Sequence, residues 1–311
     1  MSELLDVPSA VEADPPDAGV AAHYGEWSIE QRRFAGGEGF VDLSNRDVIA
    51  ISGPDRLSWL HALASQDFES LVPGIPVDAL ILSPQGHIEH AFSAIDDGET
   101  LLAHAEPGAG RPLVGFLDSM RFMSRVEVVE RQDLAVVGLP GFAWTMVGRD
   151  ELAGATKRWG LPAGLWAWEA LRIAEGHPRV GLDTDHRTIP NEVGLLNVAV
   201  HLDKGCYRGQ ETVARVHTLG RPPRRLVLLL LDGSADRLPE RGSDVLLGDS
   251  IVGFVGTSAR HFELGPIALA LVKRNTEPDV TLIVDGIAAA QEVVVDPEVG
   301  LHVRPVLGER A

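Results

Sequence analysis

The stretch Lys204-Gly205-Cys206-Tyr207-Arg208-Gly209-Gln210-Glu211 contains the only cysteine of the chain. Two glycines flank the thiol and allow the backbone to turn tightly or to approach a ligand closely. Positive charges such as those of Lys204 and Arg208 favour the thiolate form of a nearby cysteine. A lone cysteine is more often a small buried hydrophobe, but the polar residues around Cys206 argue against an apolar core. The stretch therefore predicts a functional thiol.

The segment that begins with this stretch is basic, although the chain as a whole is acidic. The formal net charge of the chain is -18. Such a surface repels nucleic acid and anionic lipid, so we expect neither as a partner. The basic segment instead suggests a small anionic ligand, unless its cations pair with acidic groups elsewhere in the protein. Its charged residues are Lys204, Arg208, Arg215, Arg221, Arg224 and Arg225 against Glu211, a net charge of +5.

The composition of the 311 residues, with 45% hydrophobic and 23% charged, is that of an ordinary globular protein. A single cysteine fits a reducing compartment. No apolar run approaches the roughly 20 residues of a membrane helix. The N-terminus has no basic region followed by an apolar core, as a secretory signal would. We therefore expect a cytoplasmic protein that does not bind a membrane.

The pattern along the chain predicts three parts. Residues 1–22 are rich in Ala, Pro, Asp and Glu, which is typical of a disordered tail. Residues 23–224 alternate strand-like and helix-like runs and predict an α+β region with room for two subdomains. The short β-like runs of residues 225–311, with hairpin turns at Gly248-Asp249 and Asp285-Gly286, predict a small barrel or sandwich.

Within the α+β region, Pro84-Gln85-Gly86 predicts a turn between strands at 77–83 and 88–95. Residues 165–175 are expected to form a helix. Glycine-rich phosphate-binding loops of the G-x-G-x-x-G and P-loop types are absent from the sequence, so nucleotide binding is not expected.

The octapeptide at 204–211 resembles the signature of the YgfZ family, folate-binding proteins that support the maturation of iron–sulfur proteins. That family shares a superfamily with the glycine cleavage T-protein, a tetrahydrofolate-dependent aminomethyltransferase. The resemblance extends from about residue 39 to 296 and includes Arg172–Gly176 and Gly181–Asp183. It implies an α+β fold in which a T-protein-like, multi-layer α/β core precedes the C-terminal antiparallel β-barrel.

The resemblance also implies ligands, partners and site residues. The cofactor would be tetrahydrofolate or another folate, and the partners would be iron–sulfur client or assembly proteins. A tryptophan at the Trp168 position is associated with the folate site in the family, whereas packing alone would make Trp168 a core aromatic. The resemblance assigns catalytic roles to Cys206 and Lys204, and cofactor binding to Trp168, Tyr207, Arg208, Gln210, Glu211 and Arg215.

Departures from the aminomethyltransferase branch leave two other interpretations open. That branch has an aspartate pair after a glycine turn, where this chain reads Gln85-Gly86-His87-Ile88-Glu89-His90, and a pterin-binding glutamate where this chain has Ala174. The first alternative is a tetrahydrofolate-dependent one-carbon (aminomethyl) transferase with Glu89 as its base. The second is a scaffold that binds no cofactor. Whether the protein turns over a substrate stays open.

A metal site within the chain is not expected. Zinc and iron–sulfur sites need several Cys or His ligands at characteristic spacings, and one cysteine cannot hold a cluster alone. Exposed acidic loops are commonly just solvated. That is how we interpret the only loose group of candidate ligands, which consists of His177, Asp183, Asp185 and His186.

Overall fold

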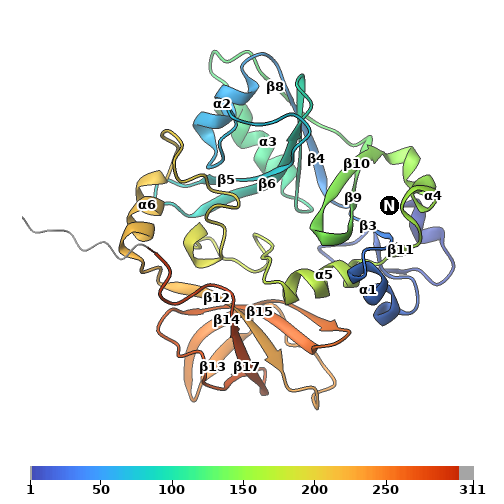
Figure 1. Ribbon diagram of the computed structural model, residues 1–311, viewed down its shortest axis with the longest axis vertical. Helices are drawn as coiled ribbons and strands as arrows, with labels where there is room; N and C mark the ends of the chain where they lie inside the picture. The colour runs from blue at the N-terminus through green and yellow to red at the C-terminus, as the bar shows by residue number, and fades with distance from the viewer. Residues whose placement is uncertain (1, 301–311) are drawn as a thin grey trace, which may run out of the picture.

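The structure is a computed structural model that describes residues 2–300. Figure 1 shows two α/β lobes and a β-barrel arranged around a common centre. This mixed architecture with a barrel at its C-terminal end confirms the predicted fold class. The predicted barrel residues 301–311 lie outside the described part.

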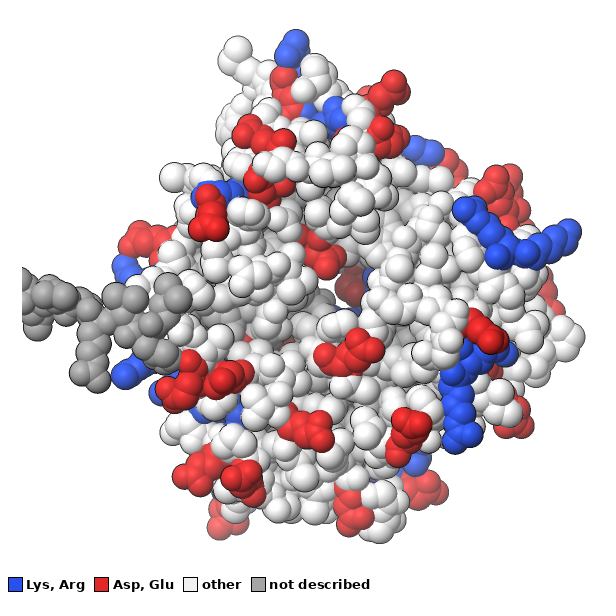
Figure 2. Space-filling model, in the orientation of Figure 1, with Lys and Arg blue, Asp and Glu red and all other residues white. Residues whose placement is uncertain are grey.

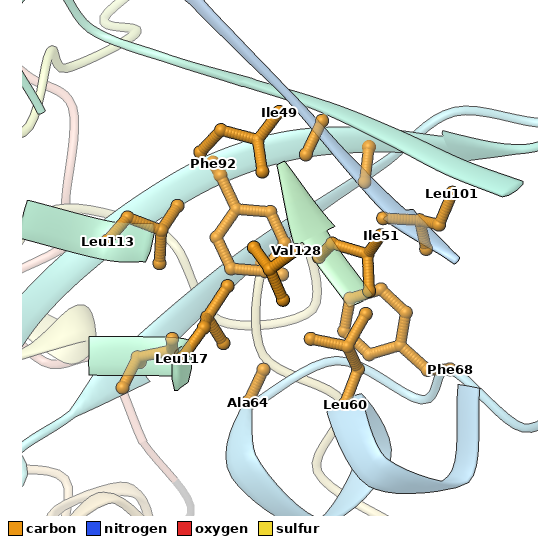
Figure 3. Close-up of a cluster of buried hydrophobic side chains, with 14 of the residues drawn as sticks. Ile49, Ile51, Leu60, Ala64, Phe68, Phe92, Leu101, Leu113, Leu117 and Val128 are labelled. Carbon is orange, nitrogen blue, oxygen red and sulfur yellow. The ribbon is translucent and has the colours of Figure 1, made fainter. Parts of the chain in front are cut away.

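The first lobe is built on a five-stranded antiparallel sheet in the order β5-β6-β7-β4-β8. Helices α2 and α3 lie beside the sheet, and the buried side chains of both layers form one core, in which Leu60 and Leu117 from the helices meet Ile51 and Phe92 from the strands (Figure 3). The predicted turn at 84–86 joins β5 to β6 as expected. The elements are β4 Asp47–Ser52, α2 Arg56–Leu63, β5 Val77–Leu82, β6 Ile88–Asp96, β7 Thr100–Ala105, α3 Gly110–Ser119 and β8 Glu127–Glu130.

The second lobe has a four-stranded sheet in the order β10-β9-β3-β11, in which only β11 and β3 are parallel. Its core packs Phe34 of α1 and Trp168 of α5 against Val136 of β9. Helix α5 also contacts β14 and β15 of the barrel, so it joins the two parts. The elements are α1 Trp27–Ala35, β3 Phe40–Asp42, β9 Leu134–Gly138, β10 Trp144–Gly148, α4 Ala155–Trp159, β11 Pro162–Ala163 and α5 Leu165–Ala174, with 3₁₀ turns η2 Pro140–Phe142 and η3 Arg149–Gly154.

The N-terminal segment corrects the expectation of a disordered tail at residues 1–22, because the structure orders residues 2–22. Strands β1 (Val11–Glu12) and β2 (Ala21–His23) pair, and a 3₁₀ turn, η1, spans Glu3–Asp6. Several apolar residues of the segment are buried: Leu4 joins the core around Phe40, and Val20 joins the core around Trp168. Composition alone does not predict the order of this segment. A few buried contacts are enough to hold it, although most of its residues are polar.

The C-terminal part is a closed antiparallel barrel in which β17 pairs back onto β12. Asp285 and Gly286 both have positive φ (49° and 76°), as a two-residue hairpin turn requires. A loop with a 3₁₀ turn, η4 (Pro190–Glu192), and helix α6 (Gln210–Leu219) connect α5 to the barrel. The barrel strands are β12 Arg224–Leu231, β13 Asp244–Leu247, β14 Ser250–His261, β15 Gly265–Lys273, β16 Leu282–Val284 and β17 Ile287–Val293.

Candidate functional site

A cavity of about 500 Å³ lies where the three parts of the molecule meet. Its lining includes Phe92 of β6, Trp144 of β10, Trp168 of α5 and Val294 just after β17. Figure 2 shows the molecule hollowed at its centre, with acidic side chains visible inside. The volume falls in the range of about 300–1,000 Å³ that is usual for small-molecule sites.

Aromatic side chains form one wall of this cavity. The ring of Trp168 lies 5.1 Å from that of Phe142 and 6.2 Å from that of Phe34, and its side chain is buried. A Cβ at Gly138 would come within 2.6 Å of Cζ3 of Trp168, so β9 needs glycine there to admit the indole. Trp168 is therefore both a core aromatic and a cavity-lining residue, which unites the two interpretations of its sequence position.

His104 of β7 adds a polar group to the same cavity. Its Nδ1 lies 3.5 Å from Nη1 of Arg46, and because a guanidinium only donates, Nδ1 accepts and the ring proton is placed on Nε2. Nε2 is buried and has no hydrogen-bond partner among residues 2–300. Burial, followed by the charge of Arg46, lowers the pKa of His104 well below its usual value. The imidazole of His104 is therefore neutral, and it lines the cavity while its Nε2–H stays buried.

The three arginines at the cavity, Arg46, Arg172 and Arg179, all form ion pairs with carboxylates. Arg179 pairs with Asp17, Glu106 and Glu169 at 2.8, 2.5 and 3.1 Å. Burial alone would raise the pKa of Glu169, but Arg172 and Arg179 outweigh it and lower that pKa to about 2. Glu169 is therefore ionised at neutral pH, and its ion pairs hold Arg172 and Arg179 in place.

A second set of contacts ties this network to the barrel. Arg172 donates to Asp183 Oδ2 at 3.0 Å, and Asp183 Oδ1 accepts hydrogen bonds from the backbone N–H and the hydroxyl of Thr257 on β14, both at 2.7 Å. Arg172 also donates to the Thr257 hydroxyl at 2.6 Å. Asp183 and Asp185 of the loose acidic loop are thus engaged by arginines, since Arg224 pairs with Asp185 at 2.7 Å. Among residues 2–300 no group of three or more His, Cys, Asp or Glu side chains is arranged to hold a metal ion.

The cysteine stretch lies outside the cavity lining. Cys206 is exposed, as the polarity of its neighbours predicts. Tyr207 is buried in the same hydrophobic cluster as Leu80 and Val193, which do line the cavity. Burial raises the pKa of Tyr207 to about 12. The stretch therefore contributes Tyr207 to a hydrophobic cluster that also supplies residues to the cavity lining, while Cys206 is exposed.

Lys204 is directed away from solvent. Its Nζ donates to the carbonyl oxygens of His61, Ala64 and Gln66 at 2.5, 2.6 and 2.9 Å, and so completes the C-terminal end of α2. The ammonium also lies 5.1 Å from the ring centroid of Tyr207. Burial lowers the pKa of Lys204 to about 8, against the opposing effect of Asp67. The geometry gives this lysine a positioning role in the loop.

The remaining predicted site residues make contacts outside the cavity. Arg208 pairs with Glu89 at 2.7 Å, and Gln210 Nε2 donates to the Lys204 carbonyl at 3.2 Å. Glu211 and Arg215 form an exposed pair one turn apart on α6, at 2.6 Å. Of the eight predicted site residues, only Trp168 lines the cavity. Sequence reasoning missed His104, Arg46 and Arg179, because only the fold brings β7, the β3–β4 turn and the loop after α5 together.

A second hollow of about 520 Å³ lies on the second lobe, between Arg33, Leu139 and Trp159. None of the predicted site residues lines it. None of the described helices is long and apolar enough to cross a membrane.

Comparisons with known proteins find similarities in sequence and in fold. No family model matches the chain. The chain is 25% identical to a putative chloroplastic transferase of Arabidopsis thaliana, over 85% of this chain and 73% of that protein. It is 26% identical to an aminomethyltransferase of Rippkaea orientalis, over 76% of this chain and 79% of that protein.

A further similarity has a higher sequence identity but covers a shorter part of the chain. The chain is 42% identical over 118 residues to the tRNA-modifying protein YgfZ of Escherichia coli, which is 36% of this chain and 35% of that protein. The crystal structure of glycine cleavage system aminomethyltransferase T from Bartonella henselae matches the fold with a TM-score of 0.77 and 17% identity, and the match covers 96% of each chain.

Proposed function

We propose that this chain, a YgfZ-type member of the glycine cleavage T-protein superfamily, binds a folate in its central cavity and serves iron–sulfur proteins as an accessory factor. The observation that carries the proposal is the cavity itself, whose lining combines the aromatic rings of Phe142, Trp144 and Trp168 with the polar side chain of His104. A pterin is flat and rich in acceptors, so it fits a slot of this chemistry.

The thiol has a separate part in this proposal. Cys206 is exposed and lies outside the cavity lining, so a protein partner can reach it without entering the cavity. Assembly or repair of an iron–sulfur protein would therefore use folate inside and the thiol outside. The net charge of −18 makes RNA a poor direct ligand, so we propose that any link to tRNA modification passes through a protein client in the cytoplasm.

The transferase alternative keeps the same ligand but adds turnover. Its only candidate base from the sequence, Glu89, pairs with Arg208 at 2.7 Å and does not belong to the cavity lining. This favours binding over aminomethyl transfer. We expect no product from tetrahydrofolate and an aminomethylated lipoyl carrier. Turnover that Glu89→Gln abolishes would instead support the transferase.

Calorimetric titration with tetrahydrofolate tests the binding step. Trp168→Ala is unsuitable because loss of a buried tryptophan costs about 3–5 kcal/mol. Val198 lines the cavity and is 52% exposed, so Val198→Trp narrows the cavity with little effect on folding. Val129, at 44% exposure on β8, offers the matched control Val129→Trp.

We expect saturable binding that Val198→Trp weakens at least roughly tenfold, which is about 1.4 kcal/mol, while Val129→Trp and Cys206→Ala leave it unchanged. No binding at millimolar ligand, or equal binding by Val198→Trp, would remove folate from the account. The thiol step is tested in cells that lack their own copy of the protein. There Cys206→Ala should fail to restore the activity of an iron–sulfur enzyme, and full restoration would exclude a role for the thiol.

A further inference from the structure

The second hollow, beside Arg33 and Trp159, takes no part in the proposed folate site. All residues that line it are half-buried or exposed, whereas the lining of the central cavity includes buried residues such as Phe92 and Arg172. Small-molecule sites bury about 70–90% or more of their ligand. The second hollow is therefore an open groove, and its shape suits a segment of a larger partner better than an enclosed small molecule.

Glycines shape this groove where two turns approach each other. Gly39, between α1 and β3, has a φ of 86°, and a Cβ there would lie 2.4 Å from the carbonyl oxygen of Leu161. Gly37 and Gly160 line the groove as well and have φ values of 91° and 87°. The sequence therefore keeps side chains out of the groove at three positions of its lining.

Apolar side chains form the walls of the groove. Leu139 and Pro140 follow β9 on one side. On the other side, the ring centroid of Trp159 lies 6.0 Å from that of Phe40, and this contact holds the indole in place. Leu161 is 64% exposed. An exposed leucine beside a fixed aromatic ring gives an apolar side chain of a partner a surface to pack on.

Arg33 brings a positive charge to the groove without a carboxylate partner. Its Nη2 donates to the carbonyl oxygens of Pro162 at 2.6 Å and of Leu161 at 3.5 Å, which positions the guanidinium. Its Nε is buried, whereas Nη1 is accessible and has no hydrogen-bond partner among residues 2–300. Glu38, the one acidic residue of the lining, is exposed and forms no ion pair in that part of the chain. A carboxylate of a partner can therefore pair with Arg33.

Two further cations lie on α4 beside the groove. The guanidinium of Arg158 is 4.6 Å from the ring centroid of Trp159, so it lies next to the apolar wall. Lys157 precedes it, and both residues are exposed and form no ion pair with the described part of the chain. Figure 2 shows exposed basic side chains over the position of α4, at the right of the molecule. With Arg33, Lys157 and Arg158 against Glu38, the groove has a net charge of +2 in a chain of net charge −18.

We propose that the second hollow docks a segment of a protein partner in which acidic residues flank an apolar side chain. The apolar side chain packs on Trp159 and Leu161, and the carboxylates pair with Arg33, Lys157 and Arg158. The acidic surface elsewhere on the chain repels such a segment, so charge directs it to this groove. The same net charge disfavours nucleic acid, whose binding rests on many phosphate contacts. The inference does not depend on folate binding and adds a partner surface to the second lobe.

Selection from a random peptide library on the immobilised full chain tests the proposal, and fluorescence anisotropy measures the affinity of each enriched peptide. The test variant Lys157→Gln/Arg158→Gln removes two cations beside the groove. The control Arg187→Gln/Arg241→Gln removes two exposed arginines that form no ion pair within residues 2–300 and line neither the cavity nor the groove. Leu161→Ser removes the exposed apolar side chain. Thermal midpoints show that each variant is folded.

We expect enriched peptides that combine Asp or Glu with a large apolar residue and that bind more weakly at high salt. The test variant should weaken their binding at least roughly fivefold, and the control should change it by less than about twofold. Leu161→Ser should weaken it at least roughly threefold, because apolar contact area is lost.

Enrichment of no peptide, or of peptides without acidic residues, would overturn the proposal, as would equal weakening by the control. Single-stranded RNA that binds wild type but not the test variant, with no peptide enriched, would assign the groove to nucleic acid instead. Tetrahydrofolate titration of Lys157→Gln/Arg158→Gln separates this proposal from the folate site. Unchanged folate binding with no enriched peptide rejects the docking surface alone, whereas lost folate binding would place that ligand in the groove and reject both.

Discussion

At the scale of single residues, His104 combines burial with an unpartnered ring nitrogen at the cavity. Its lowered pKa means that the unfolded chain binds a proton below about pH 6.5 while the folded protein does not. The contribution is therefore fully present above that pH, and the free energy of unfolding falls as the pH drops below it. The slope is at most about 1.4 kcal/mol per pH unit.

The substitution His104→Phe should remove this dependence and keep the packing against Trp144, whose ring centroid is 4.5 Å away. Urea unfolding at pH 7.5 and 5.5 measures it. We expect wild type to lose roughly 1 kcal/mol more than His104→Phe between the two pH values. Equal losses in both proteins would mean that His104 is accessible to protons in the folded state.

Lys204 offers a second test at this scale. Lys204→Met keeps an unbranched apolar side chain one atom shorter but leaves three carbonyls at the end of α2 without their donor. We expect a loss of roughly 2–4 kcal/mol in urea unfolding. Arg208→Met removes only a half-exposed pair with Glu89 and should cost about 0–1 kcal/mol. Similar costs for the two variants would contradict the positioning role of Lys204.

At the scale of elements, two glycines should respond to alanine with opposite signs. A Cβ at Gly256 of β14 would lie 2.2 Å from Oδ1 of Asp183, so Gly256→Ala should push the loop off the barrel and cost roughly 1–3 kcal/mol. Gly115 lies inside α3, and a Cβ there meets nothing within 4 Å, so Gly115→Ala should stabilise by about 0.5–1 kcal/mol. Thermal unfolding of both variants checks the signs, and destabilisation by Gly115→Ala would count against the described helix.

The elements that sequence predicts best are those with local signals. Strand alternation around the turn at 84–86 and the hairpin turn at Asp285-Gly286 fix β5–β6 and β16–β17 through residues that are neighbours in the chain. Helix α6 was not predicted, because it begins at the end of the cysteine stretch, whose glycines suggest a loop. Gly209 and Gly220 in fact bound the helix, both in the left-handed region.

The candidate site could be predicted only in part, because most of its contacts join residues that are far apart in the sequence. Trp168 could be predicted, because the family resemblance marks its place in the chain. The network around Arg179 could not, because it joins Asp17, Glu106 and Glu169. No local pattern connects a carboxylate in the N-terminal segment to an arginine 162 residues away. The basic segment shows the same limit, since Arg224 pairs with Asp185 and Glu192 and is not free for an anionic ligand.

At the scale of the whole molecule, Arg179 is the point at which the N-terminal segment, the first lobe and α5 meet. Arg179→Gln removes the buried cation that pairs with three carboxylates. We expect it to lower the free energy of unfolding by about 3–5 kcal/mol and the thermal midpoint by roughly 5–15 °C. Arg131→Gln, which breaks an exposed pair with Asp133 at 2.7 Å, is the control and should change the midpoint by less than about 2 °C. Equal midpoints for the two variants would show that the network does not hold the parts together.

The central claim is that the three parts of the molecule enclose a folate site, and a crystal structure of the protein with tetrahydrofolate tests it most directly. The account predicts ligand density in the central cavity, with the pterin against Trp144 or Trp168. Density in the hollow beside Arg33 and Trp159, or an empty cavity at saturating ligand, would contradict it.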